Sequence, residues 1–369
     1  MIIRLLQIAK WIIIQQLTIT IKMKNKIVTF GEILLRLTAP GYLKFSQAKE
    51  FTATFGGSEA NVAVSLANFG LNSEFITRLP ENDIAHSCLC ELRSHNVGTD
   101  NIIYGGGRLG IYYLENASID RGSKVVYDRA DSSFATITPG MIDWKAVLAD
   151  AQWFHWSGVA AALSPAAAEV CREGIEMAES MGLTISCDLN FRKNLWKYGK
   201  TAAEVLPDFV AHSDVIFGSH DEYKQVLGLA CPDFKAVTAD YSMPLTGYES
   251  VGQKVVEMFP KCKKVFIEFR NTINANHNTL ASVLYSDNSL KYTRVYDITH
   301  VVDCVGVGDA FVGGMIYGLI AYPENDQRAL DFAQAASCLK NTISGDFNLV
   351  TVAEVESLMK GDGSGRVSR

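Results

Sequence analysis

The stretch Val301-Val302-Asp303-Cys304-Val305-Gly306-Val307-Gly308-Asp309-Ala310-Phe311 carries the strongest fold signal in this chain. Its apolar start is typical of a strand, and after two glycines it enters a small-residue apolar run, 310–319, that predicts a buried helix. Gly306 and Gly308 let the backbone turn and let another molecule approach, and the first turn of the following helix would bind an anion. Asp309 is either a simple helix N-terminal residue or a carboxylate placed to take a proton from a hydroxyl beside that anion.

The composition is that of an ordinary globular protein. The chain has 369 residues, of which 48% are hydrophobic and 20% charged, enough for one large α/β domain or two smaller ones. Its net charge is −6 and it has no long basic block, so we expect no nucleic-acid partner. The eight cysteines form no CxxC pair, which favours free thiols in a reducing cytoplasm over a zinc site or a disulfide framework.

The two ends of the chain differ in pattern from its middle. Residues 1–22 are apolar but interrupted by Arg4 and Lys10, too short a stretch for a spanning helix, so we predict no membrane association. They also lack a clear cleavage site for a signal peptide. We therefore interpret 1–22 as an extension outside the fold, with a natural start at Met23. The tail 361–369 is flexible by composition.

From about residue 138 onward, predicted strands and helices alternate. Thr138-Pro139 and Ser164-Pro165 each combine a capping residue with proline at the first helical position, and both predict helix starts. Such alternation predicts a doubly wound, mostly parallel sheet with helices on both faces. Ligands of such sheets bind beyond the carboxyl ends of the strands. Polar residues gather at those ends, at Gly56-Gly57, 188–192, Ser219 to Glu222 and Gly306 to Asp309.

A small second sheet is predicted from strands at about 33–38 and 107–130. Its tyrosines and Arg129 would suit a sheet that lies over a polar ligand, although an exposed antiparallel sheet with aromatic cross-strand pairs explains the same pattern. Gly56 and Gly57 likewise allow two interpretations, close strand–helix packing or a ligand lying against the backbone.

Two motifs together resemble the signatures of the ribokinase-like (PfkB) carbohydrate kinases: Gly-Gly-Ser-Glu-Ala-Asn at 56–61 and Asp-Cys-Val-Gly-Val-Gly-Asp-Ala-Phe at 303–311. Within that family, the segments at 31–37, 127–129, 188–196 and 345–348 are most similar to the branch that phosphorylates 2-keto-3-deoxygluconate. The resemblance implies a ribokinase-like three-layer α/β/α fold with a small β-sheet lid. It also implies one kinase domain over 23–360 and a homo-oligomer formed through the lid.

The family likeness implies ATP-dependent transfer of a phosphoryl group to a sugar hydroxyl. Asp309 would be the catalytic base, and the backbone of Gly306, Val307 and Gly308 would form the anion hole. This agrees with the physical requirement of phosphoryl transfer for positioning and charge stabilisation.

The nucleotide side of the site follows from the same likeness. Ser219-x-x-Glu222 matches the family's Asn-x-x-Glu element, so Glu222 would organise Mg²⁺ indirectly while phosphates and water hold the ion. Asn190 and Arg270 would contact the nucleotide. The neighbourhood of Asp303 corresponds to a region that binds a monovalent cation in relatives.

Substrate recognition would depend on a carboxylate, because a guanidinium matches a sugar acid well. The residues implied as substrate contacts are Gly57, Tyr112, Tyr127, Arg129, Arg192 and Asp346. Each arginine alone would more often be a surface or salt-bridge residue, and it is their occurrence together in these motifs that favours a function. A fructokinase or ribokinase is the alternative within the family, although a neutral sugar gives no reason for two converging arginines. A non-catalytic sugar-acid-binding pseudokinase or sensor is the alternative of another class, against which the intact Asp309 argues.

Overall fold

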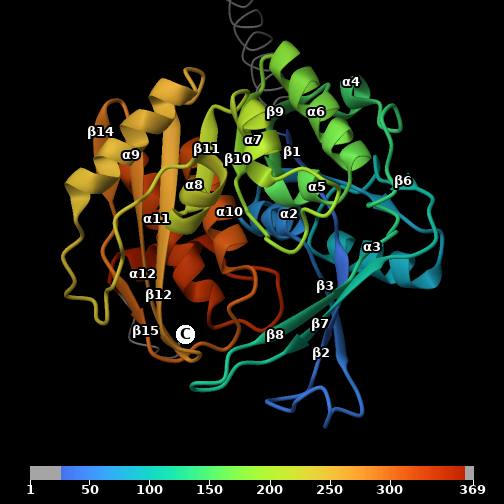
Figure 1. Cartoon of the computed structure of the whole chain (residues 1–369), viewed down its shortest axis with the longest axis horizontal. Coiled ribbons are helices and arrows are strands. Elements are labelled where there is room, and N and C mark those ends of the chain that lie inside the picture. Colours follow the sequence, from blue (N-terminus) through green and yellow to red (C-terminus); the bar gives the residue numbers. More distant parts are fainter. Residues whose placement is uncertain (1–25, 362–369) are drawn as a thin grey trace, which may run out of the picture.

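The computed structural model describes residues 26–361, and within this range nine strands form one large sheet (Figure 1). These strands are β1 Lys26–Phe30, β4 Asn72–Ile76, β9 Ala151–Ser157, β10 Thr184–Asp188, β11 Val215–Ser219, β12 Lys264–Asn274, β13 His277–Ser286, β14 Ser289–Tyr292 and β15 Tyr296–Ile298. Their order is β14-β13-β12-β11-β10-β9-β1-β4, with β15 paired to β13. The sheet is parallel from β12 to β4 and antiparallel at the β13 edge, which confirms the predicted mostly parallel sheet.

Helices cover both faces of this sheet (Figure 1). They are α2 Ser58–Asn68, α3 Asp83–Ser94, α4 Trp144–Val147, α5 Gly158–Ala162, α6 Pro165–Ser180, α7 Ala202–Val210, α8 His220–Leu227, α9 Leu245–Met258, α10 Val307–Ala321, α11 Asp326–Lys340 and α12 Val352–Met359. Successive strand residues point to opposite faces, so Val28 belongs to the core formed with α4 to α9, whereas Ile27 belongs to the core formed with α2, α10 and α11. The three-layer α/β/α arrangement is confirmed.

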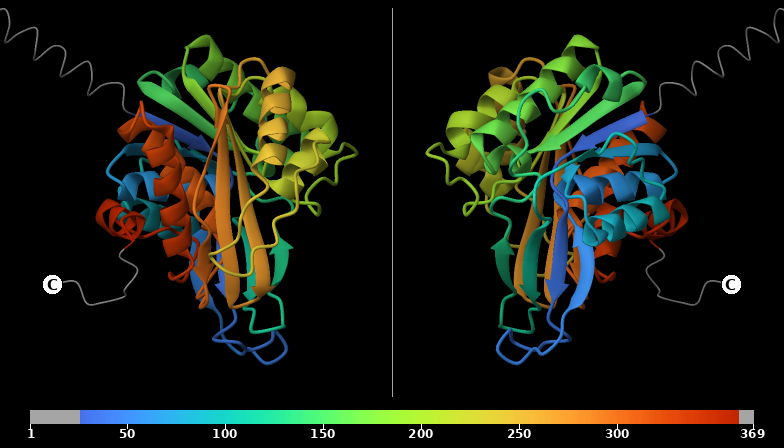
Figure 2. Two further views of the ribbon diagram at one scale, coloured as in Figure 1. Left: turned by 90° about the vertical axis from the view of Figure 1, so that its left-hand side faces the viewer. Right: turned by 90° about the vertical axis from the view of Figure 1, so that its right-hand side faces the viewer.

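A separate four-stranded sheet, the lid, projects from one end of the large sheet (Figure 1). Its strands are β2 Leu34–Thr38, β3 Thr52–Gly56, β7 Gly110–Glu115 and β8 Lys124–Asp128, in the order β3-β2-β7-β8. A short pair, β5 Arg78–Leu79 and β6 Ile103–Tyr104, lies apart from it. The lid extends beside the long β12–β13 hairpin (Figure 2), where the Ala275 N–H donates to the Ile119 carbonyl at 2.8 Å.

Two of the secondary-structure predictions from the sequence are wrong. Residues 301–302 form no strand, because their N–H groups bond to a loop and a helix end, and the edge strand is β15 instead. Thr138-Pro139 begins a turn rather than a helix. Gly140 in that turn has φ +78°, which a helix cannot accommodate, and α4 starts only after it.

The predicted extension 1–22 and residues 362–369 of the predicted tail lie outside the described residues. The assignment of 23–360 to one kinase domain stays a prediction. Among the helices of residues 26–361, none has the length and apolar character needed to cross a membrane.

Candidate active site

The site is built around the N-terminus of α10. Gly306 is its N-cap, with φ +79°, and a Cβ there would lie 2.1 Å from the carbonyl oxygen of Asp346. Glycine is therefore required twice, for the left-handed backbone and for the close approach. The Ala310 N–H is bonded to the Gly306 carbonyl at 2.9 Å, and helix geometry leaves the N–H groups before it without intrahelical partners. This end of α10 can thus hold an anion.

The glycines predicted to approach a ligand differ in what they meet. A Cβ on Gly308 would meet its first atom, Glu268 Oε2, only at 3.9 Å, so this position opens onto free space. A Cβ on Gly56 would collide with the Asp346 side chain at 2.1 Å, and one on Gly57 with the Glu32 carbonyl at 2.0 Å. Gly56 and Gly57 therefore serve close packing within the protein, whereas Gly308 faces an opening.

Asp309 lies in the first turn of α10 and is held by residues of α2. Its carboxylate accepts hydrogen bonds from the Ser58 hydroxyl at 2.8 Å and from Asn61 Nδ2 at 2.7 Å. Asn190 in turn donates to Ser58 Oγ at 2.6 Å. Burial raises the pKa of Asp309, and the bonds from Asn61 and Ser58 oppose that shift. The carboxylate is oriented by neutral donors, and the charge of Arg192 also favours its ionised form.

Ser219 and Glu222 form a capping box at the start of α8. Glu222 accepts the N–H of Ser219 at 2.8 Å and the N–H of Phe191 at 2.9 Å, so it links the ends of β10 and β11. Burial and the charge of Glu222 raise the pKa of Asp188. Glu268 of β12 was not predicted as part of this group, yet burial and the same carboxylates raise its pKa too.

This group of carboxylates has the chemistry to accept a phosphate-bound cation. Burial, and after it the charges of the neighbouring carboxylates, raise the pKa values of Asp188 and Glu268, and the buried Oδ1 of Asn190 has no hydrogen-bond partner in the described range. A divalent ion would relieve both. Residues 26–361 contain no group of three ligands able to hold a metal alone, which fits an ion carried mainly by phosphates and water.

At the sugar end, Asp346 is already held by the protein. It accepts hydrogen bonds from the Tyr112 hydroxyl at 2.7 and 2.8 Å and from Arg36 Nη1 at 2.8 Å. Arg36 also donates to Asp303 at 2.6 Å, so a lid residue joins both carboxylates. The buried Lys340, whose pKa burial lowers, faces the same pair of charges. Arg36 was not predicted to have this role.

Asp303 is further engaged by backbone donors. The N–H groups of Val305 and Gly345 each donate to its carboxylate at 3.0 Å. With Arg36 bound as well, its side chain has little left to offer a monovalent cation, and that part of the resemblance stays a prediction.

The two arginines predicted to bind the acid lie in different surroundings. Arg129 is 9% exposed and paired with Glu32, and its guanidinium lies 5.4 Å from the centre of the Tyr127 ring. Arg192 is 49% exposed and lies 3.5 Å from Glu222. Arg270 is exposed on β12, near Glu268. Arg129 and Tyr127 are thus together on the lid, while Arg192 lies beside Glu222.

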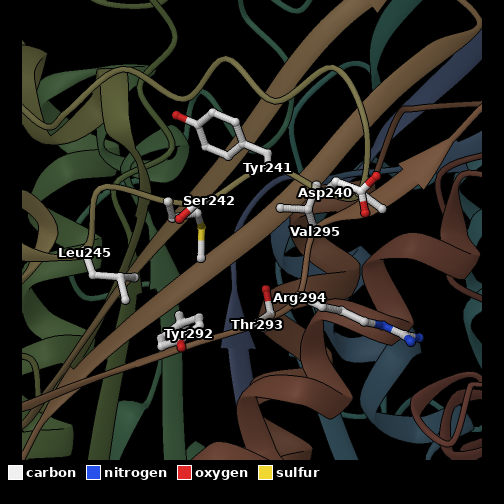
Figure 3. Close-up of a pocket in the computed structure, with 10 residues that line it drawn as sticks. Asp240, Tyr241, Ser242, Leu245, Tyr292, Thr293, Arg294 and Val295 are labelled. Carbon is white, nitrogen blue, oxygen red and sulfur yellow. The ribbon is translucent and has the colours of Figure 1, made fainter.

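A pocket of about 360 Å³ lies elsewhere, between residues 239–245 and the chain from Tyr292 to Val295 (Figure 3). Its one arginine, Arg294, points away from the other labelled side chains and donates to the Leu358 carbonyl at 2.8 Å. None of the predicted site residues lines it. The candidate active site is therefore the group around Asp309.

A carboxylate beside an open helix N-terminus, with further carboxylates for a phosphate-bound cation, defines a phosphotransferase that acts on a hydroxyl group. A family model described as pfkB family carbohydrate kinase matches residues 24–348. The chain belongs to this family.

Three comparisons refine the family placement. A curated relative, the 2-dehydro-3-deoxygalactonokinase of Haloferax volcanii, is 29% identical over 343 residues, covering 93% of this chain and 99% of the relative. The solved 2-dehydro-3-deoxygluconokinase of Thermotoga maritima is 37% identical with a TM-score of 0.84, covering 91% of this chain and 99% of that one. The fructokinase of Xylella fastidiosa with bound ATP shares the fold at 22% identity and a TM-score of 0.74, covering 92% and 99%.

Proposed function

We propose that this protein is an ATP-dependent kinase of 2-keto-3-deoxygluconate (2-dehydro-3-deoxygluconate) and forms its 6-phosphate. The observation that carries the proposal is the placement of Asp309, whose carboxylate is oriented by Ser58 and Asn61 beside the open N-terminus of α10. The relatives that are named kinases of 2-dehydro-3-deoxy sugar acids support the substrate class.

In this proposal Asp309 takes the proton of the substrate hydroxyl as that oxygen attacks phosphorus. Its hydrogen-bond donors Ser58 and Asn61 are neutral and burial raises its pKa, both of which favour its acceptance of the proton. The backbone N–H groups at Gly306, Val307 and Gly308 hold the transferring phosphoryl group. ATP supplies that group and Mg²⁺ offsets its charge. Glu222, Asp188, Asn190, Ser219 and Arg270 are the residues proposed to hold them.

The sugar acid is proposed to lie between the lid and α10. Arg129 would bind its carboxylate, with Arg192 as a second cation, and the remaining contacts would come from Gly57, Tyr112, Tyr127 and Asp346. Tyr112 donates a hydrogen bond to Asp346, so the two side chains would contact the substrate hydroxyls as a pair that is already held in place.

We also propose that the protein forms a homo-oligomer through the lid. The edge strand β8 is exposed along its whole length, and its Val126 side chain is 52% exposed. An uncovered edge strand with apolar side chains is a surface that proteins normally cover.

An ADP-release assay over a substrate panel tests the substrate. The panel contains 2-keto-3-deoxygluconate, its galactonate epimer, gluconate, fructose and ribose. We expect the highest kcat/KM with 2-keto-3-deoxygluconate. Good turnover of fructose without turnover of either keto-deoxy acid would replace the proposal by a fructokinase, and binding of an acid without any turnover would identify a sensor.

A further inference from the structure

We propose that Glu32 is a positioning residue for acid recognition, which holds Arg129 so that the free edge of its guanidinium group is presented to the substrate carboxylate. Glu32 follows the end of β1 and was assigned no role from the sequence. The inference rests on the proposed function, because it concerns how that same site reads a sugar acid.

The ion pair uses one edge of the guanidinium only. Arg129 Nε donates to Glu32 Oε2 at 2.7 Å, Nη2 contacts the same oxygen, and the Ser132 hydroxyl donates to Oε1. Within residues 26–361, Arg129 Nη1 has no hydrogen-bond partner. A planar guanidinium can bind one carboxylate on each edge. The edge that includes Nη1 is therefore available to a second carboxylate.

Charge compensation supports the same role. The Arg129 side chain is 9% exposed and that of Glu32 is 2% exposed. A buried cation without a partner is costly, so Glu32 balances the charge of Arg129 and holds its guanidinium in place before the acid arrives. Without it the guanidinium would turn toward solvent or toward another carboxyl group.

The backbone of Glu32 ties this arginine to the rest of the proposed sugar site. A Cβ on Gly57 would lie 2.0 Å from the Glu32 carbonyl oxygen, and a Cβ on Gly110 would lie 2.9 Å from Glu32 Oε1 and 3.2 Å from Arg129 Cβ. The end of β1, the start of α2 and two lid strands therefore meet at this residue. Glu32 therefore sets the position of Arg129 relative to Gly57. Both Arg129 and Gly57 are proposed to contact the substrate.

The test compares two Glu→Gln variants of the full-length protein. Glu32→Gln puts an amide N–H₂ against donors of Arg129 or Ser132, so we expect the KM for 2-keto-3-deoxygluconate to rise about tenfold while kcat and the KM for ATP change less than about twofold. Glu115→Gln is the matched control. Glu115 is also a lid carboxylate, 2% exposed and paired with Arg121 at 2.7 Å, and its replacement should leave the KM for the acid unchanged.

A double-mutant cycle separates positioning from a merely structural role. In an Arg129→Ala background, Glu32→Gln should raise the KM for the acid by less than about twofold further, because it acts only through Arg129. Ser132→Ala, which keeps the Glu32–Arg129 ion pair, should also raise the KM for the acid, but by less than Glu32→Gln does. Additive effects, a lower KM for the acid in Glu32→Gln, or parallel losses of kcat, ATP affinity and stability would overturn the inference. If Arg129→Ala itself leaves the KM for the acid unchanged, the proposed acid recognition is wrong and this inference falls with it.

Discussion

The phosphoryl end and the sugar end of the candidate site balance their charges in different ways. At the phosphoryl end, Asp309 is held by neutral donors, and the first turn of α10 is open. At the sugar end, Arg36 and Arg129 are already bound to carboxylates of the protein itself. Under the proposed function, the first end would receive a charged reactant, whereas the side chains of the second are already paired before a substrate arrives. Substitutions should therefore change the rate at the first end, and stability or substrate affinity at the second.

The largest effect is expected at the phosphoryl end. Asp309→Asn keeps the shape of the side chain but cannot accept a proton, so kcat should fall about 1,000-fold while ATP affinity is unchanged. The ADP-release assay gives kcat, and calorimetric titration with ATP gives the affinity. The exposed Asp221 of α8 supplies the control Asp221→Asn, which should keep kcat. A kcat of Asp309→Asn within tenfold of the parent would show that another group takes the proton.

At the sugar end, Arg36→Met should lower the free energy of unfolding by about 3–5 kcal/mol, because it leaves the buried Asp303 and Asp346 uncompensated. Arg108→Met is the matched change at an ion pair of the same lid, where Arg108 is 36% and its partner Asp128 52% exposed, and it should cost less than about 1 kcal/mol. Urea denaturation measures both. Equal losses in the two variants would contradict the contrast between the ends.

Gly306 and Gly308 allow a loss of stability to be compared with a loss of rate within the first turn of α10. Gly306→Ala combines a strained backbone with a collision at 2.1 Å and should lower the free energy of unfolding by about 3 kcal/mol. Gly308→Ala has room for its methyl group, so stability should hold, but the methyl enters the proposed anion hole and kcat should fall roughly 10- to 100-fold. Thermal unfolding and steady-state kinetics distinguish the two. A stable Gly306→Ala or a fully active Gly308→Ala would contradict these roles.

The smallest expected effect is a shift in pH dependence. As the proposed base, Asp309 can act only when deprotonated, and burial raises its pKa, so kcat/KM should start to fall at a higher pH than an ordinary aspartate would give. Asn61→Ala removes a hydrogen bond that lowers this pKa and should move the acidic limb to still higher pH. Asn68→Ala, on the same helix but bonded to the Asn348 carbonyl, should not move it. If Asn61→Ala moved the acidic limb of kcat/KM to lower pH, Asp309 would not be the group that sets this limb.

The predictable parts of the molecule are those with local signals. The two-glycine turn before α10, the Ser219–Glu222 capping box and the alternation of strands and helices each lie within a few residues of sequence, and all are present. Elements without such a local signal could not be predicted. Helix α9 begins after Pro244 without a side-chain cap, and the helix was not predicted.

The charge pairs of the sugar end could not be found in this way. Arg36 contacts Asp303 and Asp346 across 267 and 310 residues, and Arg129 contacts Glu32 across 97. A pair so distant in sequence leaves no periodic or spacing pattern, so Arg129 and Asp346 could be predicted as site residues while their partners could not. Ser58 and Asn61 lie inside the predicted 56–61 motif, and only the fold shows that they hold Asp309.

The N-termini of helices α2 and α10 lie next to each other. Ser58 in the first turn of α2 donates a hydrogen bond to Asp309 in the first turn of α10. Each helix start carries about half a positive elementary charge from its peptide dipoles. Together they create a positive pole made of backbone, which no side-chain substitution removes. A chain with Asp309→Asn would therefore keep this pole, and under the proposed function it would still hold ATP while being unable to take a proton from the acceptor hydroxyl.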